Sequence, residues 1–361
     1  MGSGSARRHA RWQANAVRRG PLARLLWPWA LCYGALVALR RWLYSVGFFT
    51  RHQLPVPVIV VGNVVLGGAG KTPTVLALLR HLQQQGWRPG VVSRGYGRRA
   101  QTVLEVHAGS SAADAGDEPA LIQRRSGVPV FVAARRVAAA RALLAAHPEV
   151  DLLLCDDGLQ HLALQRELAI AVFDERGVGN GWLLPAGLLR EPWPPSTRPA
   201  PVDLVLQQHR TGICPALLVA PPGVPVFHAL RRLADCAVGP GGAVMALTQL
   251  RGQRVLAVAG IARPEVFFAM LRACGLTLLQ ELALVDHADA ADYADACQRL
   301  RQDEHSTLLC TEKDAVKLFA LLAGDVCAAR VWSVALELSP EPAFFHAVDE
   351  RLRRHRPGKP S

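Results

Sequence analysis

The glycine-rich run that ends in Lys71 and Thr72 has the residue types of a phosphate-binding site. It reads Gly67-Gly68-Ala69-Gly70-Lys71-Thr72. Glycines let backbone N–H groups close around phosphate oxygens. The Lys71 ammonium can reach the terminal phosphates of a nucleotide, and the Thr72 hydroxyl can ligate Mg²⁺. The run therefore predicts a site for a nucleoside triphosphate.

The flanking residues supply the elements that such a loop needs. The standard pattern, G-x-x-x-x-G-K-[ST], places a glycine at position 65, where this chain has Val65. A glycine turn beside a surface lysine is therefore the alternative interpretation. However, the apolar stretch 58–61 predicts a strand directly before the loop, and a helical pattern follows with Pro73 in its first turn. The apolar stripe of this helix, suited to packing on a sheet, consists of Val75, Leu78, Leu79 and Leu82.

A second chemical signal is the pair Asp156 and Asp157, which follows the apolar stretch Leu152–Cys155. Carboxylates at the end of a parallel strand can hold or orient Mg²⁺ beside a phosphate loop. Asp174, after the apolar stretch 169–173, is a competitor, and acids at a strand end are often simply solvated. We favour Asp156 for the magnesium shell because Asp-Asp-Gly places two acids on one tight turn. Asp157 would share the ion or orient water.

Three further motifs combine charge with turn residues, and each has two interpretations. Asp117, in the motif GDEP, is either the N-cap of a helix or a general base or metal-shell acid. Arg94, in the motif SRGYGRR, belongs either to an anion site or to a basic surface turn. His287 follows Asp286 and is either structural or tuned by that acid to titrate near neutral pH.

The first 51 residues form a concentrated cation. They hold nine arginines and no Asp or Glu, whereas 32 basic and 29 acidic residues remain in the rest of the 361-residue chain. An uncharged run, Leu25–Leu39, lies within this segment and is followed by Trp42 and Tyr44. So much leucine and tryptophan argues for contact with a membrane rather than with nucleic acid. The nearly balanced body also carries no recognised nucleic-acid motif.

The uncharged run 25–39 is shorter than the ~18 to 20 residues that span a bilayer comfortably, and Pro28 interrupts it. We therefore predict a helix that lies in the membrane interface. The alternatives are a short tilted span, a signal peptide and a helix buried on the protein body. No small-x-small cleavage site follows the run, which argues against the signal peptide.

Composition and periodicity place the rest of the chain among α/β proteins. Half of the residues are hydrophobic, which is enough for a sizeable core. Apolar strand-like stretches alternate with helical patterns, and this alternation predicts a largely parallel sheet. The eight cysteines show no C-x-x-C or other metal-like spacing, so they fit a reducing compartment without a disulfide framework. The strand-like stretches are 56–61, 91–92, 152–155, 168–173 and 202–206, and the helical ones include 119–125 and 133–146.

The chain is expected to divide into four segments. These are a basic, aromatic, membrane-associating helical segment (1–51), a P-loop nucleotide-binding α/β domain (52–238), a smaller α/β domain (239–350) and a basic tail (351–361). The Gly/Pro cluster 239–242 is interpreted as a linker, and the proline-rich stretch 191–201 as an irregular loop. Beyond the linker, the pattern predicts strands at 254–259 and 307–310 and helices at 264–274 and 314–322.

Taken together, the motifs resemble those of the bacterial tetraacyldisaccharide 4′-kinases, from the N-terminal segment to about residue 318. The resemblance rests on VGNVVLGGAGKTP, SRGYGRR, GDEP, LLLCDDGLQH, LLPAGLLREP, VAGIARPEVF, VDH and TEKDAVK, in the family's order. It implies a kinase that uses ATP and Mg²⁺ to phosphorylate the 4′-hydroxyl of an acylated disaccharide 1-phosphate, a lipid A precursor. It also implies a place at the cytoplasmic face of the inner membrane and two α/β domains joined by a linker.

The resemblance further implies roles for individual residues. Lys71 and Thr72 would bind the ATP phosphates and Mg²⁺, and Asp156 and Asp157 would be the acids of the magnesium site, with His161 nearby. Asp117 would activate the sugar hydroxyl with the assistance of His287. Arg94 and Glu191 would have further roles in the site. Because Asp117 and His287 belong to different domains, closure between the domains is expected to assemble the site. The family often has Asp-His-His where this chain has Asp286-His287-Ala288, and often has Phe where it has Leu159.

The alternative class is a membrane-associated P-loop switch ATPase with a deviant loop. Such proteins carry a signature lysine directly before the first of these glycines, where this chain has Leu66. A GTPase would carry Asn-Lys-x-Asp or a near variant, and in Thr311-Glu312-Lys313-Asp314 the lysine stands one place late. Both features favour the kinase.

Overall fold

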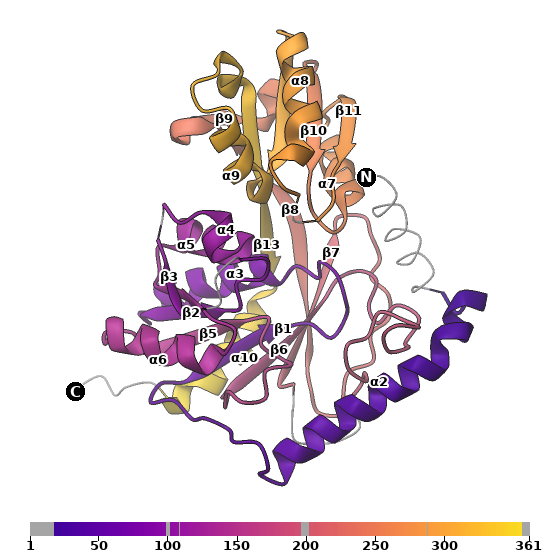
Figure 1. The fold of residues 1–361 in the computed structure, drawn as a ribbon, viewed down its shortest axis with the longest axis vertical. Coiled ribbons are helices and arrows are strands. Elements are labelled where there is room, and N and C mark those ends of the chain that lie inside the picture. Colours follow the sequence, from indigo (N-terminus) through magenta and orange to yellow (C-terminus); the bar gives the residue numbers. More distant parts are fainter. Residues whose placement is uncertain (1–17, 99–101, 108, 196–201, 287, 356–361) are drawn as a thin grey trace.

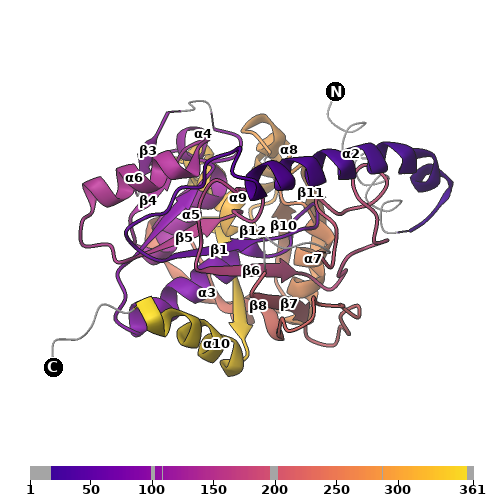
Figure 2. The same ribbon diagram turned by 90° about the horizontal axis from the view of Figure 1, so that it is seen from below.

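The computed structural model describes residues 18–98, 102–107, 109–195, 202–286 and 288–355. These residues form one sheet of 13 strands with helices on both faces (Figures 1 and 2). The strands are β1 (Val58–Gly62), β2 (Pro89–Ser93), β3 (Leu104–Val106), β4 (Val130–Val132), β5 (Leu152–Asp156), β6 (Leu168–Phe173), β7 (Leu204–Arg210), β8 (Val226–Val238), β9 (Val244–Ala246), β10 (Arg254–Ala259), β11 (Leu278–Ala283), β12 (Ser306–Thr311) and β13 (Val331–Pro340). The helices are α2 (Pro21–Ser45), α3 (Lys71–Gln84), α4 (Ala112–Ala115), α5 (Asp117–Ser126), α6 (Arg136–Ala146), α7 (Pro264–Ala273), α8 (Ala294–Gln302), α9 (Glu312–Leu321) and α10 (Pro342–Leu352).

The strands follow the order β11-β10-β12-β13-β8-β7-β6-β1-β5-β2-β4-β3, and β9 pairs with β8. Neighbouring strands are parallel except in the pairs β3–β4, β8–β9 and β8–β13. The prediction of a largely parallel α/β sheet is therefore confirmed. We call β1–β7 the N-terminal half-sheet and β10–β12 the C-terminal half-sheet, and β8 and β13 lie between them.

Both faces of the N-terminal half-sheet are buried, which explains its nearly continuous apolar strands. In β1, Ile59 and Val61 pack in a cluster with residues of α3, α5 and α10. Val58 and Val60 point to the opposite face and pack with residues of α6. In Figure 2, α3 and α10 lie below β1 and α6 lies above it. Two helical layers thus hold β1 in place and fix the position of the loop that follows it.

The C-terminal half-sheet is also covered on both faces. Val255, Ala257 and Ala259 of β10 pack with α7, whereas Val258 packs with residues of α8, α9 and β12. Period-two alternation in β10 therefore divides its side chains between two cores. These cores are separate from the two cores of the N-terminal half-sheet.

Two long strands join the halves. β8 has 13 residues and β13 has 10, and they pair antiparallel along most of their length. β8 runs from the lower to the upper half in Figure 1, and β13 runs back in the opposite direction. The predicted linker at 239–242 follows β8 as a short turn before β9. After β13 the chain returns to the N-terminal half-sheet, where α10 packs in the cluster of β1 and α3. The four-segment division stays a prediction.

The positions of most predicted elements agree with the structure. The strand predictions at 168–173 and 254–259 coincide with β6 and β10, and the helix predictions at 264–274 and 314–322 overlap α7 and α9. The helix predicted from 133 begins at Arg136, because residues 133–135 continue from β4 in a non-helical conformation. The strand predicted from 202 begins at Leu204.

The N-terminal helix α2 lies along the outside of the molecule (Figure 1). It is long and apolar enough to cross a membrane, with a mean hydropathy of 1.5 over its most apolar window, 11% of which is buried. Ala23 and Ala30 face the protein body and are 2% and 3% exposed, whereas Leu25, Trp29 and Leu36 are 73%, 68% and 65% exposed. Only a narrow strip of α2, which includes Ala23 and Ala30, is therefore buried against the protein body.

Candidate functional site

The glycine-rich run forms the turn between β1 and α3. Gly70 has a left-handed conformation, with φ of 76°, and α3 begins directly after it at Lys71. Backbone N–H groups at the start of α3 therefore face the turn, and the helix dipole adds a favourable field for an anion. On β7, which is separated from β1 by β6, the buried Gln208 donates hydrogen bonds to the Gly70 carbonyl oxygen (2.9 Å) and the Thr74 hydroxyl (2.7 Å). The Gln208 side chain therefore ties β7 to the glycine turn and to the first turn of α3.

We expect Gly70→Ala to distort this turn. A methyl group at Gly70 would lie 1.9 Å from Oε1 of Gln208, and a non-glycine residue in the left-handed region costs roughly 1–2 kcal/mol in addition. Gly86→Ala is the matched control, because Gly86 also has a positive φ of 86° but has no atom within 4 Å of the added methyl group. Isothermal titration with ATP should show a loss of affinity of about 10-fold or more for the Gly70 variant only. Equal affinity of the two variants would contradict the role given to the turn.

Asp156 and Asp157 lie beside this turn because β5 is a neighbour of β1. Val61 of β1 pairs with Asp156 of β5, so the two strands end at the same edge of the sheet. Asp157 has a φ of 50° and is the one non-glycine residue with positive φ in the described part of the chain. This conformation is tolerated by Asp and is often found at functional sites. The structure thus brings together the glycine turn and the two acids that the sequence singled out.

Lys71 and Asp157 form an ion pair, with Nζ 3.4 Å from Oδ1. Arg190 lies on the other side of Asp157, with Nη1 at 3.3 Å from both carboxylate oxygens. Burial acts to raise the pKa of Asp157, but the charges of Lys71 and Arg190 outweigh it and hold the pKa below its usual value. Lys71 also donates to Oδ1 of Asn63 at 3.4 Å, so its ammonium is held over the turn.

Asp156 is 3% exposed, and its Oδ1 has no hydrogen-bond partner among the described residues. Burial raises the pKa of Asp156 to about 7, against the lowering effect of Lys71. A buried carboxylate oxygen without a partner fits a cation, since a cation would compensate its charge. Within the described residues, no group of three or more His, Cys, Asp or Glu side chains could hold a metal ion by itself. A cation here would therefore need oxygens from the nucleotide or water.

Asp117 begins α5, and its side chain is 5% exposed. It does not cap the helix, because no side-chain cap is formed at the start of α5 and the N-cap residue is Gly116. The preceding turn packs closely on the SRGYGRR motif: a Cβ atom on Gly116 would lie 3.0 Å from Cα of Gly95. Arg94, at the end of β2, is exposed next to this contact. The motifs GDEP and SRGYGRR are therefore neighbours in space.

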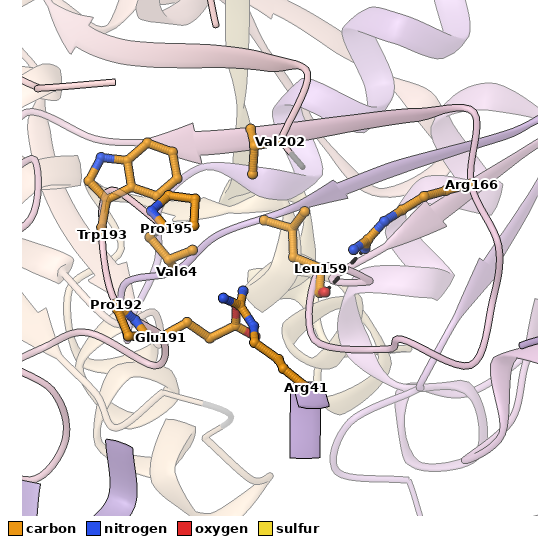
Figure 3. A pocket seen from close by; sticks show the side chains of 9 residues that line it. All are labelled: Arg41, Val64, Leu159, Arg166, Glu191, Pro192, Trp193, Pro195 and Val202. Atoms are coloured by element: carbon orange, nitrogen blue, oxygen red, sulfur yellow. Dashed lines mark hydrogen bonds and ion pairs between the residues drawn. The ribbon is translucent and has the colours of Figure 1, made fainter. Parts of the chain in front are cut away.

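Glu191, a further acid that the sequence singled out, lies against the N-terminal helix α2. It is 6% exposed and forms an ion pair with Arg41 of α2. Both residues line a small pocket together with Arg166, which donates a hydrogen bond to the Leu159 carbonyl oxygen at 3.1 Å (Figure 3). Tyr33 of α2 also donates to the backbone oxygen of the preceding residue, Arg190, at 2.9 Å. The apolar helix is thus fixed to the segment that contacts Asp157.

Two histidines complete the sequence predictions. His287, the expected partner of Asp117, lies outside the described residues. His161 is half-buried near Arg136 and Arg166, and desolvation followed by the charge of these and neighbouring arginines lowers its pKa to about 4. It is therefore neutral at pH 7. The competitor Asp174 forms ion pairs with Arg176 (2.8 Å) and Arg263 (3.4 Å), which leaves it a structural partner of these arginines.

Sequence reasoning missed three residues that contact the glycine turn or the acid turn directly, namely Arg190, Gln208 and Arg136. Arg190 was part of a quoted motif but received no role. Gln208 is buried in β7 next to Gln207, after the apolar residues 204–206, and a buried polar residue in a strand was a signal of a specific partner. Arg136 donates to the Asp157 backbone oxygen at 3.1 Å from the start of α6, and nothing in its local sequence indicates this contact.

A glycine turn between the central strand and a helix, with an acid turn on the neighbouring strand, defines a protein of the P-loop nucleotide-binding class. Comparisons with known proteins narrow the class. The family model of the tetraacyldisaccharide-1-P 4′-kinases matches residues 22–353. The chain therefore belongs to the tetraacyldisaccharide-1-P 4′-kinase family, whose members are kinases of lipid A biosynthesis.

Curated relatives and a solved structure agree with this assignment. A tetraacyldisaccharide 4′-kinase of Polaromonas naphthalenivorans is 56% identical over 343 residues, which cover 94% of this chain and 93% of the relative. One of Acidovorax sp. (strain JS42) is 52% identical over the same length and the same shares. The crystal structure of LpxK from Aquifex aeolicus in complex with ATP is 28% identical, with a TM-score of 0.75, and the match covers 92% of this chain and 99% of that chain.

Proposed function

We propose that this protein transfers the γ-phosphate of ATP to the 4′-hydroxyl of an acylated disaccharide 1-phosphate, a precursor of lipid A. Membership of this kinase family supports the reaction, and the structure of the related LpxK in complex with ATP supports ATP as the phosphate donor. The observation that carries the proposal is the convergence of the glycine turn, Lys71 and the two acids of β5 at one edge of the sheet. Phosphoryl transfer depends mainly on position and charge, and this edge offers both.

On this proposal the backbone of 67–72 surrounds the phosphates, and Lys71 leaves Asp157 to neutralise the transferred group. Mg²⁺, when bound with the nucleotide, would neutralise charge on the phosphate oxygens. The Thr72 hydroxyl, the orphan oxygen of Asp156 and Asp157 are the protein groups suited to hold it. Arg190 would keep Asp157 in place once Lys71 has moved.

Asp117 is proposed as the general base that accepts the proton of the sugar hydroxyl, with His287 as its helper. Its burial and its position at the start of α5 support this role, since an ionised carboxylate is favoured at a helix N-terminus. Arg94 is exposed beside the GDEP turn and is suited to contact an anionic group of the acceptor. Glu191 is proposed to act through Arg41, by fixing the membrane helix next to the site.

We further propose that α2 places the enzyme on the cytoplasmic face of the inner membrane. The exposed apolar face of α2 and the arginines at both of its ends support this placement. An acceptor with fatty acyl chains resides in the membrane, so the link between Arg41 and Glu191 would hold the phosphate site close to its substrate.

The double variant Trp29→Glu/Leu36→Glu is expected to lose membrane binding. Each removed apolar side chain costs about 1.5–3 kcal/mol of burial, so partition onto anionic phospholipid vesicles should fall roughly 100- to 10,000-fold. Leu217→Glu is the control, because Leu217 is 93% exposed but lies in a loop outside α2. Vesicle sedimentation at moderate salt checks the result, and unchanged binding of the double variant would assign the anchoring to another surface.

The transfer reaction itself is tested with [γ-³²P]ATP and vesicles that contain the acylated disaccharide 1-phosphate. Label is expected in the lipid extract, in amounts that depend on the acceptor. Release of inorganic phosphate that does not depend on the acceptor, without labelled lipid, would instead support a switch ATPase.

A further inference from the structure

The helix α9 presents two lysines to the start of α5. Lys313 and Lys317 are four residues apart and therefore lie on one face of α9. Their side chains are 12% and 20% exposed. α9 belongs to the C-terminal half-sheet and α5 to the N-terminal one, and the two helices are in contact (Figure 1). The sequence motif TEKDAVK, which contains both lysines, has no role in the function derived above.

Lys317 joins three separate segments of the chain. Its Nζ lies 3.1 Å from Oδ1 and 3.4 Å from Oδ2 of Asp117. The same ammonium donates a hydrogen bond to the backbone oxygen of Ala288 at 2.8 Å. In the sequence, Ala288 directly follows His287. One side chain thus links the proposed base to the segment that carries its proposed helper.

Lys313 makes a second set of contacts with the same groups. Its Nζ lies 2.8 Å from Asp286, 3.6 Å from Asp117 and 3.7 Å from Glu118. Burial acts to lower the pKa of Lys313, but the charges of these carboxylates outweigh it and raise the pKa. Lys313 is therefore charged at pH 7. It places a cation close to three carboxylates, of which Asp117 is buried and Asp286 is exposed.

These contacts differ from ordinary docking of two helices. Arg125 of α5 and Glu312 of α9 also form an ion pair across the same boundary, at 2.6 Å. Lys317 instead binds both oxygens of the carboxylate and so limits its rotation. A base that must meet one hydroxyl proton works only in a narrow range of orientations.

We propose that Lys317, together with Lys313, is a positioning residue for phosphoryl transfer, which orients the Asp117 carboxylate and keeps the segment at Ala288 beside it. The proposal rests on the proposed role of Asp117 as the base. Both lysines lie on α9, which packs on the C-terminal half-sheet. The proposal therefore makes completion of the site depend on contact between α9 and α5.

Steady-state kinetics of lipid phosphorylation with full-length variants test the proposal. Lys317→Met keeps an unbranched side chain of similar length and removes its charge, so kcat should fall on the order of 100-fold while the KM for ATP changes less than about 3-fold. Lys317→Arg should recover most of the lost kcat, because it restores a cation. If Lys317→Met fails to fold, Lys317→Gln carries the same test. A wild-type kcat in either neutral variant would overturn the proposal.

Two controls separate positioning from docking and from the role of the base. Arg125→Ala breaks the other ion pair between α5 and α9 and should leave kcat within about 3-fold of wild type. An equal loss in Arg125→Ala and Lys317→Met would reduce the lysine to a docking contact. In the Asp117→Asn background, Lys317→Met should cause no further loss of kcat. If Asp117→Asn alone keeps full kcat, the proposed base is wrong. If it loses kcat while Lys317→Met does not, only the positioning role is wrong.

Discussion

Replacement of Lys71 by alanine is expected to reduce phosphate transfer to the lipid about 100- to 1000-fold, the typical effect of removing one group that stabilises charge in a transition state. Lys71 stands at the first position of α3, with its ammonium between Asn63 and Asp157. It is therefore within reach of a phosphate held by the glycine turn. The described residues contain two other lysines, Lys313 and Lys317, and both are engaged with Asp117.

The fold should survive the Lys71→Ala substitution. Asp157 keeps its ion pair with Arg190, so no carboxylate loses all its positive partners. Arg80→Ala is the matched control, because Arg80 is an exposed cation on the same helix, and its loss should leave the rate nearly unchanged. Transfer of ³²P from ATP to the lipid measures the effect. Substantial transfer by Lys71→Ala, at saturating ATP, would show that the phosphates bind elsewhere.

Asp117→Asn should lower kcat about 100- to 10,000-fold, the range in which positioned proton transfer contributes, with little change in the KM for ATP. The substitution preserves the shape of the side chain and removes its ability to accept a proton. Lys317 and Lys313 retain Ala288, Glu118 and Asp286 as partners, so the contact between α5 and α9 should persist.

The control for this prediction is Asp114→Asn. Asp114 is an exposed carboxylate three residues before Asp117 and bonds to Ser111, so kcat should remain at the wild-type value. Thermal unfolding of both variants shows whether the fold is intact. A variant of Asp117 that unfolds at a lower temperature but keeps its kcat would make this residue a structural group of the α5–α9 contact.

The sequence predicted the elements of the fold where one local pattern determined them. Buried parallel strands such as β6 are uninterrupted apolar runs, and the stripe at Val75 and Leu82 identified α3. β13 was missed because its mixed residues follow no single period. One face of this strand packs in the core, and β8 pairs along its edge. The return of α10 to the first core could not be predicted from local patterns, which do not encode contacts across more than 200 residues.

The same distinction holds for the candidate site. The glycine turn and Asp156 could be predicted because strand ends are recognisable and parallel strands end at one edge of the sheet. Gln208 and Lys317 could not be predicted, because Gln208 bonds to Gly70 across 138 positions and Lys317 bonds to Asp117 across 200. The roles assigned to individual site residues stay predictions until the variants above are measured.

The position of α10 has a consequence for the synthesis of this protein. Phe344, Val348 and Leu352 complete the hydrophobic cluster that surrounds β1 and α3, and His81 of α3 stacks on Phe345 with ring centroids 4.4 Å apart. A nascent chain that has emerged only as far as β13 therefore exposes apolar surface beneath the very strand that leads into the glycine turn. The ribosome must release the chain through residue 352 before the first-made half can close its interior, and termination before α10 removes support from residues made at the beginning.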